Sequence, residues 1–103
     1  MQNKVKEFNN KLDCHKKPIP INARLLDISS EFGELAKEYL KATSYGTKSF
    51  ENTLDFELEF GDVLYSLLSL ANECNLDANV ALEKVLDKYS KRFKNNNNLG
   101  SGR

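Results

Sequence analysis

The feature that most constrains this chain is the spacing of its apolar residues, which recur every three or four positions along most of its length. Val5, Phe8 and Leu12 begin the pattern. This spacing places apolar side chains on one face of a helix, and no segment shows the alternation typical of a half-buried strand. Breaks at proline, glycine and short polar runs divide the pattern into four segments. The sequence therefore predicts an all-α fold, an antiparallel four-helix bundle-like subunit.

The boundaries of these helices follow from the breaks and from residues that favour helix N-caps. We expect helices over roughly residues 2–13, 22–41, 49–74 and 77–93. The expected N-caps are Asn22, Ser49 or a neighbour, and Asp77. A single helical domain should cover residues 1–94. The tail 95–103 contains the low-complexity run NNNNLGSGR, and we expect it to be disordered.

Charge and cysteine usage exclude several classes of protein. Lysine plus arginine equals aspartate plus glutamate at 15 each, so the chain lacks the basic excess of a general nucleic-acid binder. No apolar run approaches the ~18 residues of a membrane span, and the N-terminal segment lacks a signal-peptide core. Cys14 and Cys74 lack zinc-site spacing, and Cys74 fits a small core residue. We therefore expect a cytoplasmic protein with reduced thiols, without membrane or nucleic-acid partners.

Two similar acidic motifs, EFGE and EFGD, lie in the second and third expected helices. At 100° per residue, the first acid of each motif falls about 100° from the centre of the apolar face, and the second about 160° to the same side. A short loop joins the two helices, so they should pair antiparallel, with both motifs roughly 15 Å from the loop. Because the acids have equal angular offsets on the two antiparallel helices, their side chains should point to the same edge of the pair. The acids expected to converge there are Glu31, Glu34, Glu59 and Asp62.

Four carboxylates without arginine partners would repel one another in a partly desolvated cleft, so a cation should lie among them. Their hard oxygen ligands suit Mg²⁺, or alternatively Mn²⁺, both of which also bind substrate phosphates. A solvated acidic face is the usual interpretation of one Glu-x-x-Glu motif, but two copies matched in phase and height weaken it. Gly33 and Gly61 lie on the other flank of each apolar face, where a missing side chain would allow close helix approach.

At these residues the sequence resembles the MazG-like family of all-α nucleoside triphosphate pyrophosphohydrolases, over roughly residues 22–93. The family pattern is Glu-Glu-x-x-Glu, a spacer, and then Glu-x-x-Asp. The segment SEFGELAKE matches the first motif and ELEFGD matches the second. Ser30 stands where the family usually has its first glutamate. This departure leaves the number of metal ions open, or implies that Asp27 or Glu38 contributes a ligand.

The resemblance implies Mg²⁺-dependent hydrolysis of a (d)NTP to the (d)NMP and pyrophosphate, as housekeeping of the nucleotide pool. It also implies a homodimer, or a dimer of dimers, with the nucleotide near the subunit interface. Glu31 or Glu34 would orient or deprotonate the attacking water. The candidate substrate contacts are Lys48 in the loop, Lys88 and Arg92 in DKYSKRF, and Tyr65 or Tyr45 for the base. The alternatives for these residues are a solvated basic stripe and ordinary aromatic packing.

Two other functions stay open. Ser30 is compatible with a non-catalytic nucleotide or metal sensor on the same fold. A helical interaction module, with the acids only on its surface, is the second alternative. No residue pattern indicates the base or the sugar of a nucleotide substrate.

Overall fold

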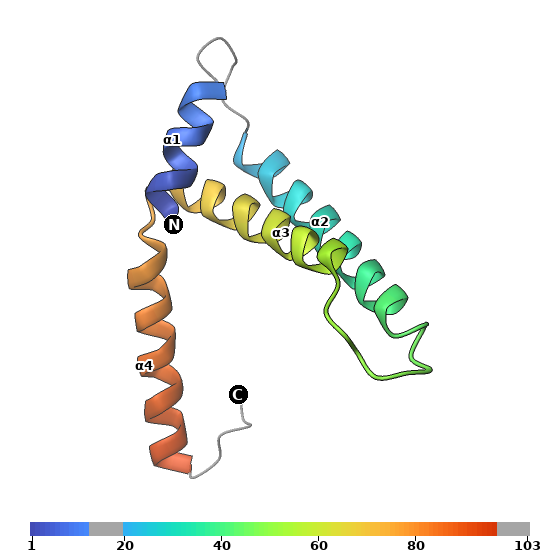
Figure 1. The fold of residues 1–103 in the computed structure, drawn as a ribbon. Helices are drawn as coiled ribbons and strands as arrows, with labels where there is room; N and C mark the ends of the chain where they lie inside the picture. Colours follow the sequence, from blue (N-terminus) through green and yellow to red (C-terminus); the bar gives the residue numbers. More distant parts are fainter. Residues whose placement is uncertain (13–19, 97–103) are drawn as a thin grey trace.

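The computed structural model describes residues 1–12 and 20–96 of the chain, and these ranges form four α-helices (Figure 1). The helices are α1 (Gln2–Leu12), α2 (Ile21–Ala42), α3 (Leu54–Glu73) and α4 (Ala78–Asn96). The described ranges contain no strand, which confirms the predicted all-α class. Cys14 and most of the predicted disordered tail lie outside the described residues. None of the four helices combines the length and hydropathy that a membrane span requires.

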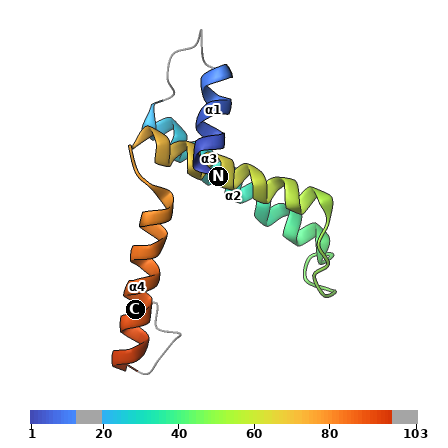
Figure 2. The same cartoon turned by 60° about the vertical axis from the view of Figure 1, so that its left-hand side comes forward.

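The centre of the fold is the pair formed by α2 and α3, which lie side by side and antiparallel (Figures 1 and 2). This is the hairpin that the short connection predicted. Val63, Leu68 and Ala71 of α3 are buried, so the small core lies along this helix. Two buried serines accompany them, and Ser69 is completely inaccessible to solvent. Small side chains at such positions let neighbouring helices approach α3.

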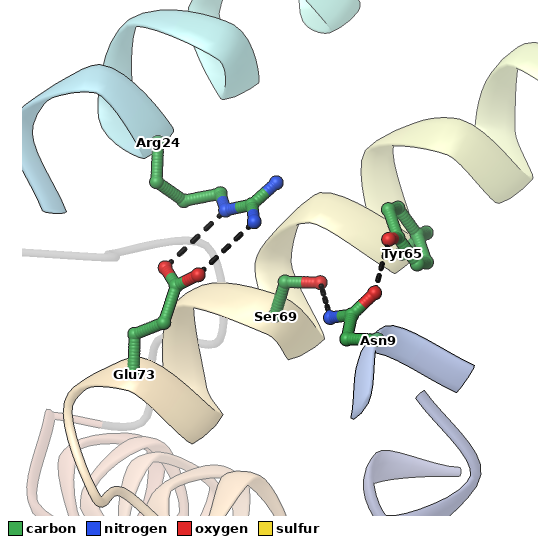
Figure 3. Close-up of polar contacts among 5 residues, drawn as sticks. All are labelled: Asn9, Arg24, Tyr65, Ser69 and Glu73. Atoms are coloured by element: carbon green, nitrogen blue, oxygen red, sulfur yellow. Dashed lines mark hydrogen bonds and ion pairs between the residues drawn. The ribbon is translucent and has the colours of Figure 1, made fainter. Parts of the chain in front are cut away.

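The short helix α1 packs across α3 through both apolar and polar contacts. The rings of Phe8 and Tyr65 meet edge to face, with centroids 6.2 Å apart. The Tyr65 hydroxyl donates a hydrogen bond to Oδ1 of Asn9. Nδ2 of Asn9 in turn donates to Oγ of Ser69, at 3.0 Å (Figure 3). Asn9 therefore satisfies the buried serine hydroxyl and ties α1 to α3 at the same point.

N-caps were predicted for α2, α3 and α4, and the predicted residue caps only one of these three helices. Asp77 accepts from the Val80 N–H at 3.1 Å, which confirms the predicted cap of α4. The cap of α3 is Thr53, later than the expected Ser49, and its hydroxyl accepts from Phe56 N–H. The predicted cap of α2 was wrong, because Pro20 occupies the cap position and Asn22 lies within the helix. Pro20 has extended backbone angles, with φ −60° and ψ 148°, and no side chain caps this helix end.

The helix α4 leaves the other three at an elbow after α3 and extends away from the α2–α3 pair (Figures 1 and 2). Bundle-like packing within one chain is therefore limited to α1, α2 and α3. The elbow itself is held by Gln2 of α1. Its Nε2 donates to Oδ1 of Asn72 and to the Leu76 carbonyl, and its Oε1 accepts from Ala78 N–H at 2.8 Å. These bonds connect α1, the end of α3 and the first turn of α4.

Two packing predictions from the sequence were wrong. Cys74 is exposed at the elbow, because α4 does not fold back to cover it. A Cβ added at Gly33 or Gly61 would meet no atom within 4 Å, so neither glycine serves close helix approach within the chain. Gly61 instead lines a cavity between α1 and α3.

Candidate metal centre

Three of the four predicted carboxylates come together at one edge of the α2–α3 pair. Glu31 of α2 and the α3 residues Glu59 and Asp62 each offer one oxygen, and these oxygens all lie within 4.8 Å of one another. Glu31 and Glu59 are partly buried, whereas Asp62 is exposed. We call these three residues the carboxylate cluster.

Local helix geometry and the antiparallel pairing together produce the cluster. Glu59 and Asp62 are three residues apart, so their side chains are neighbours on one face of α3. Glu31 reaches them from α2 because the two motifs lie at matched heights on either side of the helix contact. Glu34 is exposed and lies outside the close group of three. Its charge still acts on the cluster, since it is one of the carboxylates that perturb Glu59.

The electrostatics of the cluster are those of an uncompensated group of negative charges. Partial desolvation raises the pKa of Glu59 above its ordinary value, and the neighbouring charges of Asp62, Glu31, Glu34 and Glu38 raise it further, in that order. Within residues 1–12 and 20–96 the ion pairs are Arg24–Glu73, Lys41–Glu38 and Lys91–Asp87. None of these pairs neutralises the cluster, so a bound cation would relieve the repulsion.

The donor set fits a hard divalent cation. Mg²⁺ binds oxygens at 2.0–2.1 Å, so oxygens around one ion lie about 3–4 Å apart. The 4.8 Å spread of the cluster is slightly wider, and small side-chain rotations would close it. The exposed side at Asp62 leaves space for water and phosphate oxygens, and the cluster includes no cysteine or histidine. Glu31, Glu59 and Asp62 could therefore hold Mg²⁺ or Mn²⁺.

Glu38 and Asp27 are the acids that the sequence offers in place of the glutamate absent at position 30. Glu38 pairs with Lys41 at 3.2 Å, and its side chain is only 14% exposed. Its charge is therefore already partly compensated. Asp27 is exposed on α2 and takes part in none of the described ion pairs, and Ser30 is also exposed.

The candidate phosphate contacts lie on other elements. Lys88 and Arg92 are on α4, which extends away from the helix pair that carries the cluster (Figure 1). The ammonium of Lys88 lies 5.5 Å from the centre of the Tyr89 ring. Lys48 is exposed in the connection between α2 and α3. A single chain therefore does not bring the cations of α4 to the carboxylates.

Tyr65, the candidate for base stacking, holds α1 in place. Its ring packs on Phe8 and its hydroxyl binds Asn9. The same tyrosine lines an apolar cavity of about 440 Å³ between α1 and α3, to which Gly61 and Leu64 also contribute. These contacts favour the packing role among the two roles that the sequence left open for Tyr65.

One ion pair, at the end of the hairpin far from the α2–α3 connection, was not predicted from the sequence. Nε and Nη2 of Arg24 donate to the two carboxylate oxygens of Glu73, at 3.2 and 3.0 Å (Figure 3). The guanidinium is buried, and its hydrogen bonds to Glu73 raise the pKa of Arg24. The carboxylate of Glu73 is therefore neutralised by an arginine and does not belong to the uncompensated acids of the carboxylate cluster. The available signal was Arg24 itself, a charged residue in helical phase with Ile28, on the side of α2 that faces α3.

Comparison with known proteins agrees with the site geometry. A sequence model of the MazG nucleotide pyrophosphohydrolase domain matches residues 21–97, which include the whole carboxylate cluster. The uncharacterized protein YpjD of Bacillus subtilis (strain 168) is 38% identical over 80 residues, covering 75% of this chain and 68% of the relative. No solved structure matches the chain significantly.

Proposed function

Since the chain belongs to the MazG nucleotide pyrophosphohydrolase family, we propose that it hydrolyses a (d)NTP to the (d)NMP and pyrophosphate with the help of Mg²⁺. The observation that carries this proposal is the carboxylate cluster, three acids from two helices with oxygens within 4.8 Å of one another and no basic partner among the described ion pairs. Mn²⁺ would serve the same ligands. A cytoplasmic location, nucleotide-pool housekeeping and a homo-oligomeric working form belong to the same proposal.

Glu31, Glu59 and Asp62 are the proposed metal ligands, with Glu34 at the rim. When bound there, the metal would neutralise phosphate charge and acidify a water molecule. The ligands come from two packed helices, so their positions are set before substrate arrives. Such preorganisation matters because positioning and electrostatics supply most of the catalysis in phosphoryl chemistry.

We assign the orientation and deprotonation of the attacking water to Glu34. It is the one acid of the two motifs outside the close group of three, and it is exposed. A carboxylate that is not needed as a ligand stays free to accept a proton from water. Glu31 is the second candidate, although its place in the close group favours a role as ligand. Lys48, Lys88 and Arg92 are the proposed phosphate contacts.

The first experiment measures pyrophosphate release from a panel of natural and modified (d)NTPs, with Mg²⁺ and with EDTA. Asp62→Asn should remove activity, because it replaces a charged ligand. The matched control is Glu57→Gln, which neutralises an exposed acid of the same helix outside the cluster. This variant should keep activity. If the folded wild-type protein turns over no member of the panel, the proposed reaction is wrong.

Ser30 supports one second candidate, a nucleotide or metal sensor that does not catalyse hydrolysis. Calorimetry distinguishes the two functions. Nucleotide binding that requires Mg²⁺, with no product after prolonged incubation, would favour the sensor. Turnover in the same sample would exclude it.

A further inference from the structure

The pair Glu38 and Lys41 of α2 repeats the placement of the first acidic motif, two turns nearer to the connection with α3. Glu38 follows Glu31 by seven residues, and Lys41 follows Glu34 by seven. At 100° per residue, seven residues bring a side chain back to within about 20° of its starting direction and advance it about 10 Å along the axis. The edge of α2 that carries two acids at the carboxylate cluster therefore carries an acid and a lysine farther on.

The ion pair fixes the position of the Lys41 ammonium. Nζ of Lys41 donates to Oε2 of Glu38 at 3.2 Å, so the side chain is directed back along α2 toward the carboxylate cluster. The hydrogen bond to Glu38 raises the pKa of Lys41, and Asp55 is among the charges that raise it further. Asp55 precedes Glu59 by four residues, so the two lie on the same face of α3. The ammonium is therefore held beside the edge that both helices form at the cluster.

Glu38 connects this ion pair to the cluster, and Lys41 connects it to solvent. Desolvation and then the three nearer acids raise the pKa of Glu59 most, and the charge of Glu38 also contributes. The Lys41 side chain is 55% exposed, whereas that of Glu38 is 14% exposed. An ammonium has three donors, and Glu38 accepts from one of them. The other two donors are available to a ligand that lies at the cluster.

Arg24 has a matching position on the other side of the cluster, but it is already committed. It precedes Glu31 by seven residues, so it lies in the same helical phase two turns away. Its side chain is 8% exposed, and its Nε and Nη2 both donate to the carboxylate of Glu73. A substrate at the cluster therefore meets a buried, paired cation in one direction along α2 and the exposed ammonium of Lys41 in the other.

The chemistry of the proposed substrate fits an ammonium at this place. A nucleoside triphosphate is a linear chain of charged groups, so the two outer phosphates extend away from the phosphate next to the nucleoside. A lysine ammonium is a compact charge that binds phosphate oxygens through charge-assisted hydrogen bonds. When the anhydride bond breaks, the leaving pyrophosphate takes the electron pair, and a fixed positive charge stabilises it.

We propose that Lys41 binds the pyrophosphate half of the substrate, and that Glu38 holds its ammonium at the edge of the helix pair before the substrate arrives. This inference rests on the proposed function and deepens it. It adds to the candidates on the connection and on α4 a phosphate contact from the same helix that carries Glu31 and Glu34.

Calorimetry with inorganic pyrophosphate and Mg²⁺ tests the proposal on the full chain without requiring turnover. Lys41→Met should raise the dissociation constant of pyrophosphate about 10- to 100-fold, because it removes a charge-assisted hydrogen bond. Lys41→Arg should keep most of the affinity, since a guanidinium also binds phosphate oxygens. Lys41 is exposed, so helix content measured by circular dichroism should be the same in both variants as in the wild type.

The matched control is Lys37→Met, which removes an exposed lysine of the same helix. Lys37 is closer to Glu31 along the axis than Lys41 is, but it lies about 120° around α2 from Glu31. This variant should bind pyrophosphate as the wild type does. Equal losses in the two methionine variants would show that only the total charge matters, and this result would overturn the proposal.

Two other results would also overturn the role of Lys41. One is a wild-type protein that binds no pyrophosphate in the presence of Mg²⁺, and the other is a Lys41→Met protein with wild-type affinity. Failure of the proposed reaction gives a different result, in which pyrophosphate binds through Lys41 but no (d)NTP is hydrolysed. If the wild type does hydrolyse a (d)NTP, Lys41→Met should raise its KM, and Lys37→Met should leave the KM unchanged.

Discussion

Replacing Gly33 by alanine tests whether the outward face of α2 is open. Gly33 lies inside a 22-residue helix, and a Cβ added there would meet no atom within 4 Å. Glycine in a helix interior is about 1 kcal/mol less favourable than alanine, chiefly because a glycine has more backbone freedom in the unfolded chain and loses more of it on folding. With no steric cost in the folded state, Gly33→Ala should raise the free energy of unfolding by about 1 kcal/mol.

For a domain of this size, 1 kcal/mol corresponds to a rise in Tm of roughly 4–8 °C. Thermal unfolding followed by circular dichroism measures this shift. Wild type and variant must be compared at one protein concentration, since the Tm of an oligomer depends on concentration.

Gly46→Ala is the matched control, because the same substitution should have the opposite sign there. Gly46 has φ +87°, a backbone conformation that residues other than glycine rarely adopt. A Cβ at such a position costs about 1–2 kcal/mol. A Cβ added at Gly46 would also meet no atom within 4 Å. The difference in stability between the two variants therefore reports the backbone conformation and not packing.

A Tm that falls for Gly33→Ala, while Gly46→Ala behaves as expected, would refute the reasoning. The added Cβ would then meet an atom that the chain itself does not supply. That result would place a second copy or another partner against this face of α2 and would restore the close-approach role that the sequence suggested for the glycine.

Three further predictions concern the ion pair, the cluster and the assembly. Arg24→Ala should lower the free energy of unfolding by roughly 2–3 kcal/mol in urea denaturation, because it leaves the partly buried Glu73 carboxylate without its guanidinium. The raised pKa of Glu59 means that the folded metal-free protein binds this proton more tightly than the unfolded chain. The protonated Glu59 carboxyl therefore contributes its full stabilisation below pH 4.5, and this contribution is lost as the pH rises through the raised pKa. The free energy of unfolding, measured in EDTA, should fall over this pH range in the wild-type protein, and this fall should be absent in Glu59→Gln. If Arg92 serves the site of a second copy, mixing inactive Asp62→Asn and Arg92→Ala proteins after subunit exchange should restore activity; no recovery would place Arg92 outside the partner's site.

Much of the candidate site could be predicted from the sequence because its geometry is largely local. Helical phase places Glu59 beside Asp62, and a short connection makes an antiparallel pair the expected arrangement of the two motifs. Glu31 was then predictable from its matched height. The structure refines this set, since Glu34 lies at the rim while the other three acids form the close group.

Contacts across long sequence separations could not be predicted in the same way. Arg24 and Glu73 are 49 residues apart, and Asn9 and Tyr65 are 56 residues apart. Periodicity shows that a face is apolar or charged, but many pairings of such faces are compatible with the same pattern. Periodicity therefore did not reveal that Glu73 is neutralised by an arginine or that Tyr65 packs against α1.

The sequence alone determined the four helices, their approximate limits and the phase of the acidic motifs, because these depend on residues within a few turns of one another. Only the tertiary structure decided which apolar faces are covered. Leu86 and Val63 belong to similar apolar stripes, yet Val63 is buried and Leu86 is 55% exposed. The difference arises because α3 has neighbours on two sides, whereas α4 leaves the elbow without one, and burial depends on the neighbours that a helix meets in space.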